Sequence, residues 1–144
     1  MKTPRLVVVD TNVLVAGLIS GEPNSSTVQI VDAMLDGRLI YLFSPHLLQE
    51  YRQVLLRPKL LRLHGLDEEQ IDQLLTEITA NALWRERLPE ATEHAPDPGD
   101  EHLWQLLALE PAAVLITGDR LLLEQPPTSG SVLSPAEGVG LLLR

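Results

Sequence analysis

The stretch Leu6-Val7-Val8-Val9-Asp10 decides the fold, because it joins a short apolar run directly to an acid. Four consecutive apolar residues, three of them β-branched, are typical of a strand that is buried on both faces of a parallel sheet. A second apolar run, Val114-Leu115-Ile116-Thr117, is followed two residues later by Asp119. Ligands of open parallel α/β sheets bind at the carboxyl ends of the strands, so we expect Asp10 and Asp119 to line one pocket.

Strands alternate with helices along the rest of the chain, and residues 39–43 and 132–133 are expected to be strands. Ser44-Pro45 and Ser134-Pro135 each combine an N-cap residue with a proline at the first helical position, which predicts a helix after each of these strands. A polar, proline-rich loop is expected over residues 85–99, and the other expected helices cover residues 13–19, 26–36, 60–64, 67–78, 100–109 and 119–123. This alternation predicts a three-layer α/β/α fold with a mostly parallel central sheet.

The chain has 144 residues, which is enough for one domain over residues 1–144 and short for two. It has no cysteine, so disulfides, iron–sulfur clusters and thiolate zinc sites are excluded. The four histidines show no H-E-x-x-H or similar spacing, and on this ground we expect no zinc site. No apolar run reaches the length of a membrane-spanning helix, and the first apolar run ends at Asp10 without a cleavage site. We therefore expect a cytoplasmic protein with no membrane partner.

The charge balance narrows the class of partner. A net charge of −9, from 20 acidic and 11 basic residues, argues against broad nonspecific binding to DNA, for which a basic face is expected. It does not argue against a nuclease, because acids that hold a metal ion contribute to the total. Nine of the 11 basic residues are arginine, whose side chain suits bidentate contact with phosphate.

Two further acidic positions are expected at the same pocket. Glu50 lies at the edge of the apolar stripe of the helix that begins at Pro45, and Asp100-Glu101 open the helix at residues 100–109. Carboxylates that are crowded together repel one another unless a cation neutralises them. Mg²⁺ and Mn²⁺ are hard ions that prefer oxygen ligands, so one of these two ions is the expected cofactor.

Each acid also has an ordinary structural interpretation. Asp10 and Asp119 are good N-cap residues for the helical turns that follow them. Glu50 alone would be a common surface glutamate, and Asp97-Pro98-Gly99-Asp100 matches an N-cap, a first-turn proline and an acid that the helix dipole favours. A metal site is favoured over this set of interpretations, because both strand-end acids would otherwise have to meet at one sheet edge by chance.

Other acid-dependent classes fail on particular residues. Asp10-Thr11-Asn12-Val13 resembles the first motif of haloacid-dehalogenase phosphatases, but Asn12 stands where their second acid is required. Lys2 and Lys59 come too early for a response-regulator receiver, and dinucleotide, P-loop and serine-hydrolase motifs are absent from the sequence. A metal-dependent phosphodiesterase remains, in which one or two cations activate a water molecule and stabilise the leaving oxygen.

The acids, taken with their neighbours, resemble the motifs of the PIN-domain nucleases over nearly the whole chain. Val7–Val13 resembles the family's first strand and acid, and Leu48–Leu55 is similar to the helix that carries its second acid. Asp97–Leu103 resembles the third acidic cluster, and Ile116–Arg120 resembles the last motif. The order and spacing of four motifs make this resemblance specific.

The resemblance implies a three-layer PIN-like fold and an Mg²⁺- or Mn²⁺-dependent ribonuclease that acts on single-stranded RNA. Such proteins are commonly the toxin of a bacterial toxin–antitoxin pair, so the resemblance also implies an antitoxin protein as a partner. The acids that it implies as metal-binding and catalytic residues are Asp10, Glu50 and Asp119.

The position that corresponds to the family's third acid is occupied by the acidic doublet Asp100-Glu101. The apolar face of its helix favours Asp100, counting back from Thr117 favours Glu101, and both stay candidates for metal binding and catalysis. The residues expected to orient the ligands or the attacking water are Thr11, Asn12 and Thr117. Substrate contact is expected from basic residues near the pocket mouth, which are Arg120 and the basic cluster Arg52, Arg57, Lys59 and Arg62. A solvated helix face explains each member of the cluster, Arg52 included, equally well, whereas Arg120 is favoured because its neighbour should line the pocket.

Two other functions stay open at this stage. A catalytically weak PIN-like module would bind RNA or an antitoxin without cleavage, and the intact set of acids argues against it. A small-molecule phosphohydrolase would release phosphate from monoesters. The sequence leaves open the RNA target, the number of metal ions and the oligomeric state, for which a homodimer is one option.

Overall fold

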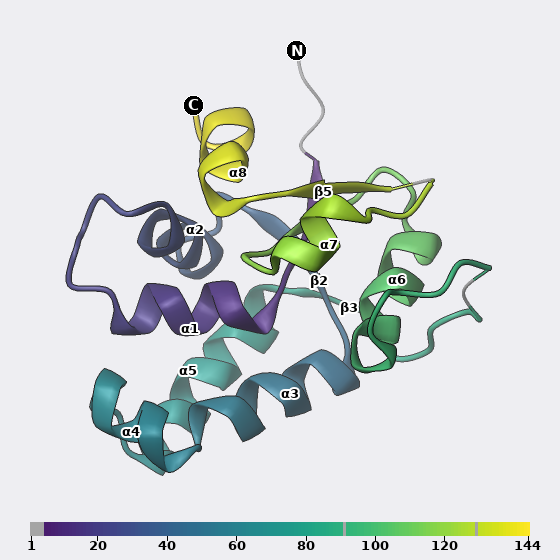
Figure 1. The fold of residues 1–144 in the computed structure, drawn as a ribbon. Coiled ribbons are helices and arrows are strands. Elements are labelled where there is room, and N and C mark those ends of the chain that lie inside the picture. The colour runs from purple at the N-terminus through teal and green to yellow at the C-terminus, as the bar shows by residue number, and fades with distance from the viewer. Residues whose placement is uncertain (1–4, 91, 129) are drawn as a thin grey trace.

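Five strands form one sheet at the centre of the computed structural model, which describes residues 5–90, 92–128 and 130–144 (Figure 1). The strands are β1 Leu6–Val9, β2 Ile40–Phe43, β3 Leu83–Trp84, β4 Val114–Ile116 and β5 Ser131–Leu133. Their order across the sheet is β3-β2-β1-β4-β5, and every pairing within these described ranges is parallel. The sequence-based expectation of a mostly parallel sheet is confirmed.

Helices cover the sheet on both faces. They are α1 Thr11–Ile19, α2 Ser26–Leu35, α3 Pro45–Leu55, α4 Pro58–His64, α5 Glu68–Asn81, α6 Glu101–Leu109, α7 Arg120–Glu124 and α8 Pro135–Leu142, with a 3₁₀ turn at Pro98–Asp100. Helix α6 packs against β1 and β4, while α2 packs against α1, α5 and α8. Figure 1 shows α2 and α6 on opposite sides of the strands, which gives the three layers expected from the sequence. None of the described helices has both the length and the apolar character needed to cross a membrane.

Most helices begin within two residues of the predicted position, because their capping residues act as expected. Ser44 accepts a hydrogen bond from the Leu47 amide at 3.2 Å, and Ser134 forms a capping box with Glu137. Helix α1 begins directly after Asp10, two residues before the predicted start, because Asp10 itself is the cap.

Three segments, α4, β3 and residues 85–99, can be compared with the secondary structure expected from the sequence. Helix α4 begins at Pro58, two residues early, because a proline fits the first helical position, where no N–H is needed. Strand β3 was not predicted, since two residues are too few to show an alternating pattern. The Trp84 ring of β3 packs on Phe43 of β2 with ring centroids 6.0 Å apart. The expected loop over residues 85–99 has no helix or strand in its described part before Pro98, and residue 91 lies outside the described residues.

Buried contacts at β1 fix the position of the site. Val7, Val8 and Val9 are at most 1% exposed, as expected for a strand that is covered on both faces. The fully buried Tyr51 of α3 donates a hydrogen bond from its hydroxyl to the Val9 carbonyl. Because an unpaired buried carbonyl is unfavourable, this bond holds α3, and with it Glu50, against the carboxyl end of β1.

The strand order creates a crevice beside β1. From β1 the chain passes to β2 and β3 and then returns to β4 on the other side of β1. The Asp10 amide donates to the Ile116 carbonyl at 3.0 Å, which keeps the ends of β1 and β4 together. Ligands of open α/β sheets bind at such a change of direction, so the fold places the acids that follow β1 and β4 at its binding edge.

Candidate metal centre

Asp10 follows β1 directly and is held by three donors. Its Oδ1 accepts a hydrogen bond from the Thr11 amide at 2.8 Å, which caps α1. Its Oδ2 accepts from the Thr117 hydroxyl at 2.8 Å and from the Asn12 side-chain amide at 3.2 Å. Only 4% of the residue is exposed. The capping role considered for Asp10 is therefore real, and the second carboxylate oxygen is bound by residues from both strand ends.

A polar network joins the loops after β1 and β4. The Asn12 side-chain oxygen accepts from the Gly118 amide at 2.8 Å, and the Asn12 nitrogen donates to the Thr117 hydroxyl at 3.3 Å. The same hydroxyl accepts from the Asp119 amide at 2.9 Å. Thr117 is fully buried, so the two bonds to its hydroxyl also satisfy a polar group that water cannot reach. The network sets the separation of Asp10 from Asp119.

A pocket of about 500 Å³ opens at this edge of the sheet. Its acidic lining comes from four segments: the end of β1, helix α3, the 3₁₀ turn before α6 and the loop between β4 and α7. These acids are Asp10, Glu50, Asp100 and Asp119. Asp119 also caps α7, since it accepts from the Leu121 amide at 2.9 Å. The fold thus brings acids from four separate sequence motifs to one pocket.

Burial and mutual repulsion raise the pKa of two of these acids. Burial raises the pKa of Asp10, and the hydrogen bonds from Thr117 and Thr11 offset only part of that effect. Burial also raises the pKa of Asp100 to about 6, with further contributions from the charges of Asp10, Asp97, Asp119 and Glu50. Carboxylates with raised pKa values are disfavoured in their ionised form, and a bound divalent cation reverses this effect.

The structure separates the two candidates for the third acid. Asp100 lines the pocket and, within the described part of the chain, its side chain makes no capping bond to α6. The Glu101 carboxylate instead bonds the His94 ring and accepts from the Ala95 amide at 2.8 Å, and these two contacts lower the pKa of Glu101. Glu101 is not among the residues that line the pocket. The pocket position therefore belongs to Asp100.

Glu50 lies between the acid pocket and two histidines. Its Oε1 accepts from the Thr11 hydroxyl at 2.7 Å, and its Oε2 lies 2.9 Å from Nε2 of His102. The hydrogen bond from His102 lowers the pKa of Glu50, although partial burial opposes it. His102 stacks on His46 with ring centroids 3.9 Å apart and nearly parallel rings. Glu50 is thus bonded on both sides, unlike a common surface glutamate.

The two histidines were not predicted as site residues. The expectation of no zinc site rested on spacing along the chain, and that spacing does not show contacts between helices. His102 comes from α6, 52 residues after Glu50, yet the ligand atoms of His46, Glu50 and His102 all lie within 4.8 Å of one another. The available sequence signal was the spacing of four residues between His46 and Glu50, which places both on one face of α3.

Of the basic residues expected at the substrate, Arg52 and Arg120 lie outside the pocket lining. Arg52 pairs with Asp72 and with Glu68 of α5, each at 2.8 Å. The Arg120 side chain is 90% exposed and pairs at 3.3 Å with an acid one turn further along α7. Arg57, between α3 and α4, is the arginine that lines the pocket.

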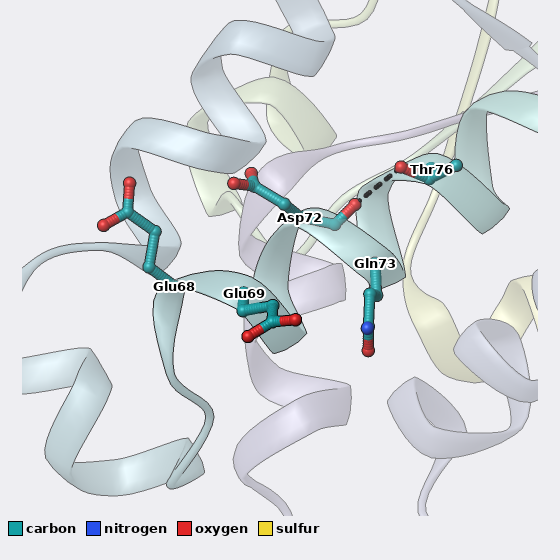
Figure 2. Close-up of a pocket in the computed structure, with 5 residues that line it drawn as sticks. All are labelled: Glu68, Glu69, Asp72, Gln73 and Thr76. Carbon is teal, nitrogen blue, oxygen red and sulfur yellow. Dashed lines mark hydrogen bonds between the residues drawn. The ribbon is translucent and has the colours of Figure 1, made fainter.

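A second acidic hollow, of about 570 Å³, lies on the surface of α5 (Figure 2). Helix α5 alone supplies its lining, which consists of Glu68, Glu69, Asp72, Gln73 and Thr76. Figure 2 shows the Thr76 hydroxyl bonded to the Asp72 carbonyl, at 2.7 Å. The carboxylates of Glu68 and Asp72 already have Arg52 as counter-ion. Arg52 lowers the pKa of Asp72 here, whereas burial and neighbouring acids raise the pKa of Asp100 in the strand-end pocket.

Comparison with known proteins agrees with this geometry. A family model described as a PIN domain matches residues 6–121, a span that includes all four acids of the pocket. An uncharacterized protein of Methanocaldococcus jannaschii is 30% identical over 117 residues, which cover 81% of this chain and 72% of that protein. No solved structure matches the chain.

Proposed function

Because the chain belongs to the PIN domain family, whose members are generally metal-dependent nucleases, we propose that it is an Mg²⁺- or Mn²⁺-dependent endoribonuclease that cleaves single-stranded RNA. The observation that carries this proposal is the strand-end pocket, where acids from four segments meet. No nucleophilic side chain is needed for such a reaction, because water can be the nucleophile.

The donor chemistry of the pocket fits a hard divalent cation. Carboxylate oxygens are the ligands that Mg²⁺ and Mn²⁺ prefer. The repulsion that contributes to the raised pKa of Asp100 is relieved when a cation is shared among the acids. The residues that would hold the ion are Asp10, Glu50, Asp100 and Asp119. When bound, the ion would supply charge stabilisation at the phosphate and lower the pKa of the attacking water.

The other residues of the pocket orient the acids and contact the substrate. Thr117 and Asn12 hold one carboxylate oxygen of Asp10, and Thr11 holds one oxygen of Glu50. Such bonds fix the direction of a ligand before an ion or substrate arrives. In the proposed reaction Arg57, at the pocket wall, is the member of the basic cluster that donates to a phosphate oxygen of the RNA.

Two features support single-stranded RNA over duplex DNA. The net charge of −9 is unfavourable for a protein that binds the regular phosphate array of a duplex. The pocket is small, about 500 Å³, and its described lining contains one arginine among the acids. A flexible single strand can bend one phosphate into such a pocket, whereas a stiff duplex presents its backbone to a broader surface.

We propose the toxin of a toxin–antitoxin pair as the biological setting, with a small antitoxin protein as partner. The resemblance of the acidic motifs supports this part of the proposal. Growth arrest on expression of the chain, relieved by co-expression of a short neighbouring reading frame, tests it. Growth that is unaffected by expression of an active ribonuclease would argue against the toxin role.

The proposed activity is tested by a substrate panel with the full chain. End-labelled single-stranded RNA, duplex RNA, single-stranded DNA and a phosphate monoester are each incubated with Mn²⁺, Mg²⁺ or EDTA. We expect internal cleavage of single-stranded RNA that EDTA abolishes. Binding of RNA without cleavage under any metal condition would support the catalytically weak binding module, and phosphate release from the monoester would support a phosphohydrolase.

A further inference from the structure

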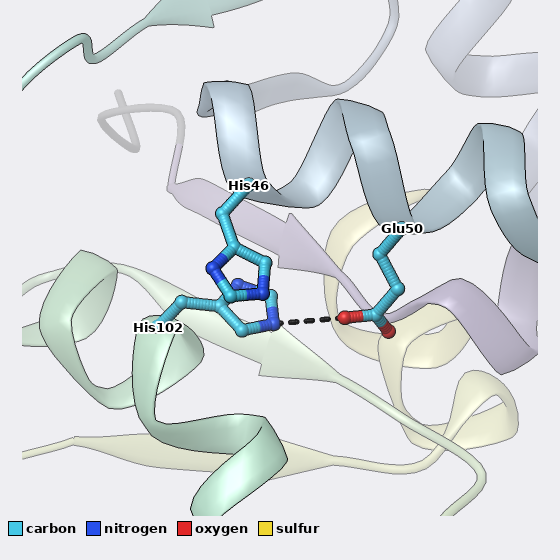
Figure 3. A group of neighbouring side chains, drawn as sticks. All are labelled: His46, Glu50 and His102. Atoms are coloured by element: carbon cyan, nitrogen blue, oxygen red, sulfur yellow. Dashed lines mark hydrogen bonds and ion pairs between the residues drawn. The ribbon is translucent and has the colours of Figure 1, made fainter.

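Three side chains beside the acid pocket form a cluster with a different ligand chemistry (Figure 3). His46 and Glu50 lie one turn apart on α3, and His102 reaches them from α6. Figure 3 shows the two imidazole rings stacked next to the Glu50 carboxylate. Two imidazoles and one carboxylate are the ligand set of open zinc sites, whereas Mg²⁺ disfavours nitrogen ligands.

His102 has coordination capacity that the protein does not use. The residue is 2% exposed, and its Nε2 is 2.9 Å from Oε2 of Glu50. Its Nδ1 is buried and has no hydrogen-bond partner among the described residues. Because Nδ1 has no partner there, no hydrogen bond at Nδ1 fixes the ring tautomer. When the proton is on Nδ1, the lone pair of Nε2 faces Oε2 of Glu50, and a cation between these two atoms makes that approach favourable. A buried nitrogen without a partner is uncommon in proteins, and it is independent of the carboxylate crowding in the pocket.

We propose that His46, Glu50 and His102 form a Zn²⁺ site that shares Glu50 with the acid pocket. Two ligand atoms bound to one tetrahedral zinc lie about 3.3 Å apart, given zinc–ligand bonds of about 2.0 Å. The distance of 2.9 Å from His102 Nε2 to Glu50 Oε2 is within a few tenths of an ångström of that value. His46 is exposed, so its ring is free to turn out of the stack and direct a nitrogen at the ion.

Sharing of Glu50 couples this site to the pocket. Oε2 of Glu50 faces the histidines while Oε1 faces Thr11 and the pocket, so a Zn²⁺ ion bound through Oε2 would withdraw negative charge from the acid pocket. Zn²⁺ therefore lowers the affinity of the acid pocket for Mg²⁺ and inhibits cleavage. This consequence rests on the proposed nuclease function, whereas the Zn²⁺ site itself does not.

The site is tested by Zn²⁺ binding without RNA. The full chain is titrated with Zn²⁺ against a coloured chelator, as wild type, His46→Gln and Asp100→Asn. His46→Gln removes a ligand from an exposed position, and Asp100→Asn is the matched control that alters only the acid pocket. We expect Zn²⁺ affinity to fall at least about tenfold in His46→Gln and to stay near the wild-type value in Asp100→Asn.

Substitution with Co²⁺ supplies a second readout. Tetrahedral Co²⁺ bound by imidazole absorbs visible light far more strongly than octahedral Co²⁺ on oxygen ligands, so the wild-type complex should show this band and His46→Gln should lose it. Equal Zn²⁺ affinity of wild type and His46→Gln would overturn the proposal. Equal loss of Zn²⁺ in His46→Gln and Asp100→Asn would also overturn it, because the ion would then lie in the acid pocket. A chain that binds Zn²⁺ in this way but cleaves no RNA would refute the proposed function alone.

Discussion

Asp100→Asn should stabilise the metal-free protein and blunt its response to Mn²⁺. Asp100 has a pKa raised to about 6 by burial and by its acidic neighbours. A rise of this size disfavours the charged form by roughly 3 kcal/mol, and screening by water at this partly exposed site reduces the effect to about 1 kcal/mol. For a chain of this size, about 1 kcal/mol corresponds to a gain of roughly 2–4 °C in melting temperature.

The shift in melting temperature caused by Mn²⁺ is expected to be larger than the shift caused by the substitution itself. An ion that binds only the folded state stabilises it by about 2.7 kcal/mol at a hundredfold excess over Kd, which raises the melting temperature by roughly 5–11 °C. If Asp100→Asn weakens binding about a hundredfold, the same Mn²⁺ concentration contributes only about 0.4 kcal/mol. Thermal melts of both proteins at pH 7.5, with and without Mn²⁺, measure this difference.

Glu101→Gln is the matched control, because Glu101 neighbours Asp100 in sequence but bonds His94 and the Ala95 amide outside the pocket. We expect this variant to keep the full Mn²⁺ response. Na⁺ at equal ionic strength controls for screening of the repulsion. A full Mn²⁺ response in Asp100→Asn, or a lost response in Glu101→Gln, would show that the assignment of the third acid is wrong.

Three further predictions follow from individual contacts. As pH rises from about 4 to about 6, the folded protein retains the Asp100 proton that the unfolded chain has released, so metal-free wild type should lose stability relative to Asp100→Asn across this window in urea titrations. Gly17→Ala should destabilise by roughly 1–3 kcal/mol in the same assay, because a Cβ would lie 2.8 Å from the Thr27 carbonyl; an unchanged midpoint would contradict the α1–α2 packing. Tyr51→Phe should cost about 1–3 kcal/mol by leaving the Val9 carbonyl without its donor, and a variant as stable as wild type would contradict that bond.

The parts of the fold that local physics determines could be predicted from the sequence. The apolar run before Asp10 predicts a buried strand because its pattern needs no knowledge of its neighbours. Ser44-Pro45 predicts the start of α3 because capping is a contact within a few residues. The parallel order of the strands then follows from their alternation with helices, and it brings Asp10 and Asp119 to one sheet edge.

The features of the site that could not be predicted depend on contacts between residues that are far apart in the sequence. The bond between His102 and Glu50 joins two helices, so no spacing rule reveals it. The apolar face of the helix favoured Asp100, which lines the pocket, whereas counting back from Thr117 favoured Glu101; that count carries no information on the His94 ring and the Ala95 amide, which bind the Glu101 carboxylate outside the pocket. Arg52 and Arg57 belong to one basic cluster in sequence, but Arg52 lies within α3 and pairs with α5, whereas Arg57 follows the end of α3 in extended backbone and lines the pocket.

Cleavage of single-stranded RNA by wild type and Asp10→Asn, in Mn²⁺ and at equal folded concentration, tests the proposed metal centre most directly. Asparagine preserves the shape and the acceptor that caps α1, and it removes one charge from the pocket. We expect wild type to cleave and Asp10→Asn to be at least about a hundredfold slower, with an unchanged circular dichroism spectrum. Cleavage by Asp10→Asn at the wild-type rate would contradict a catalytic role for this pocket.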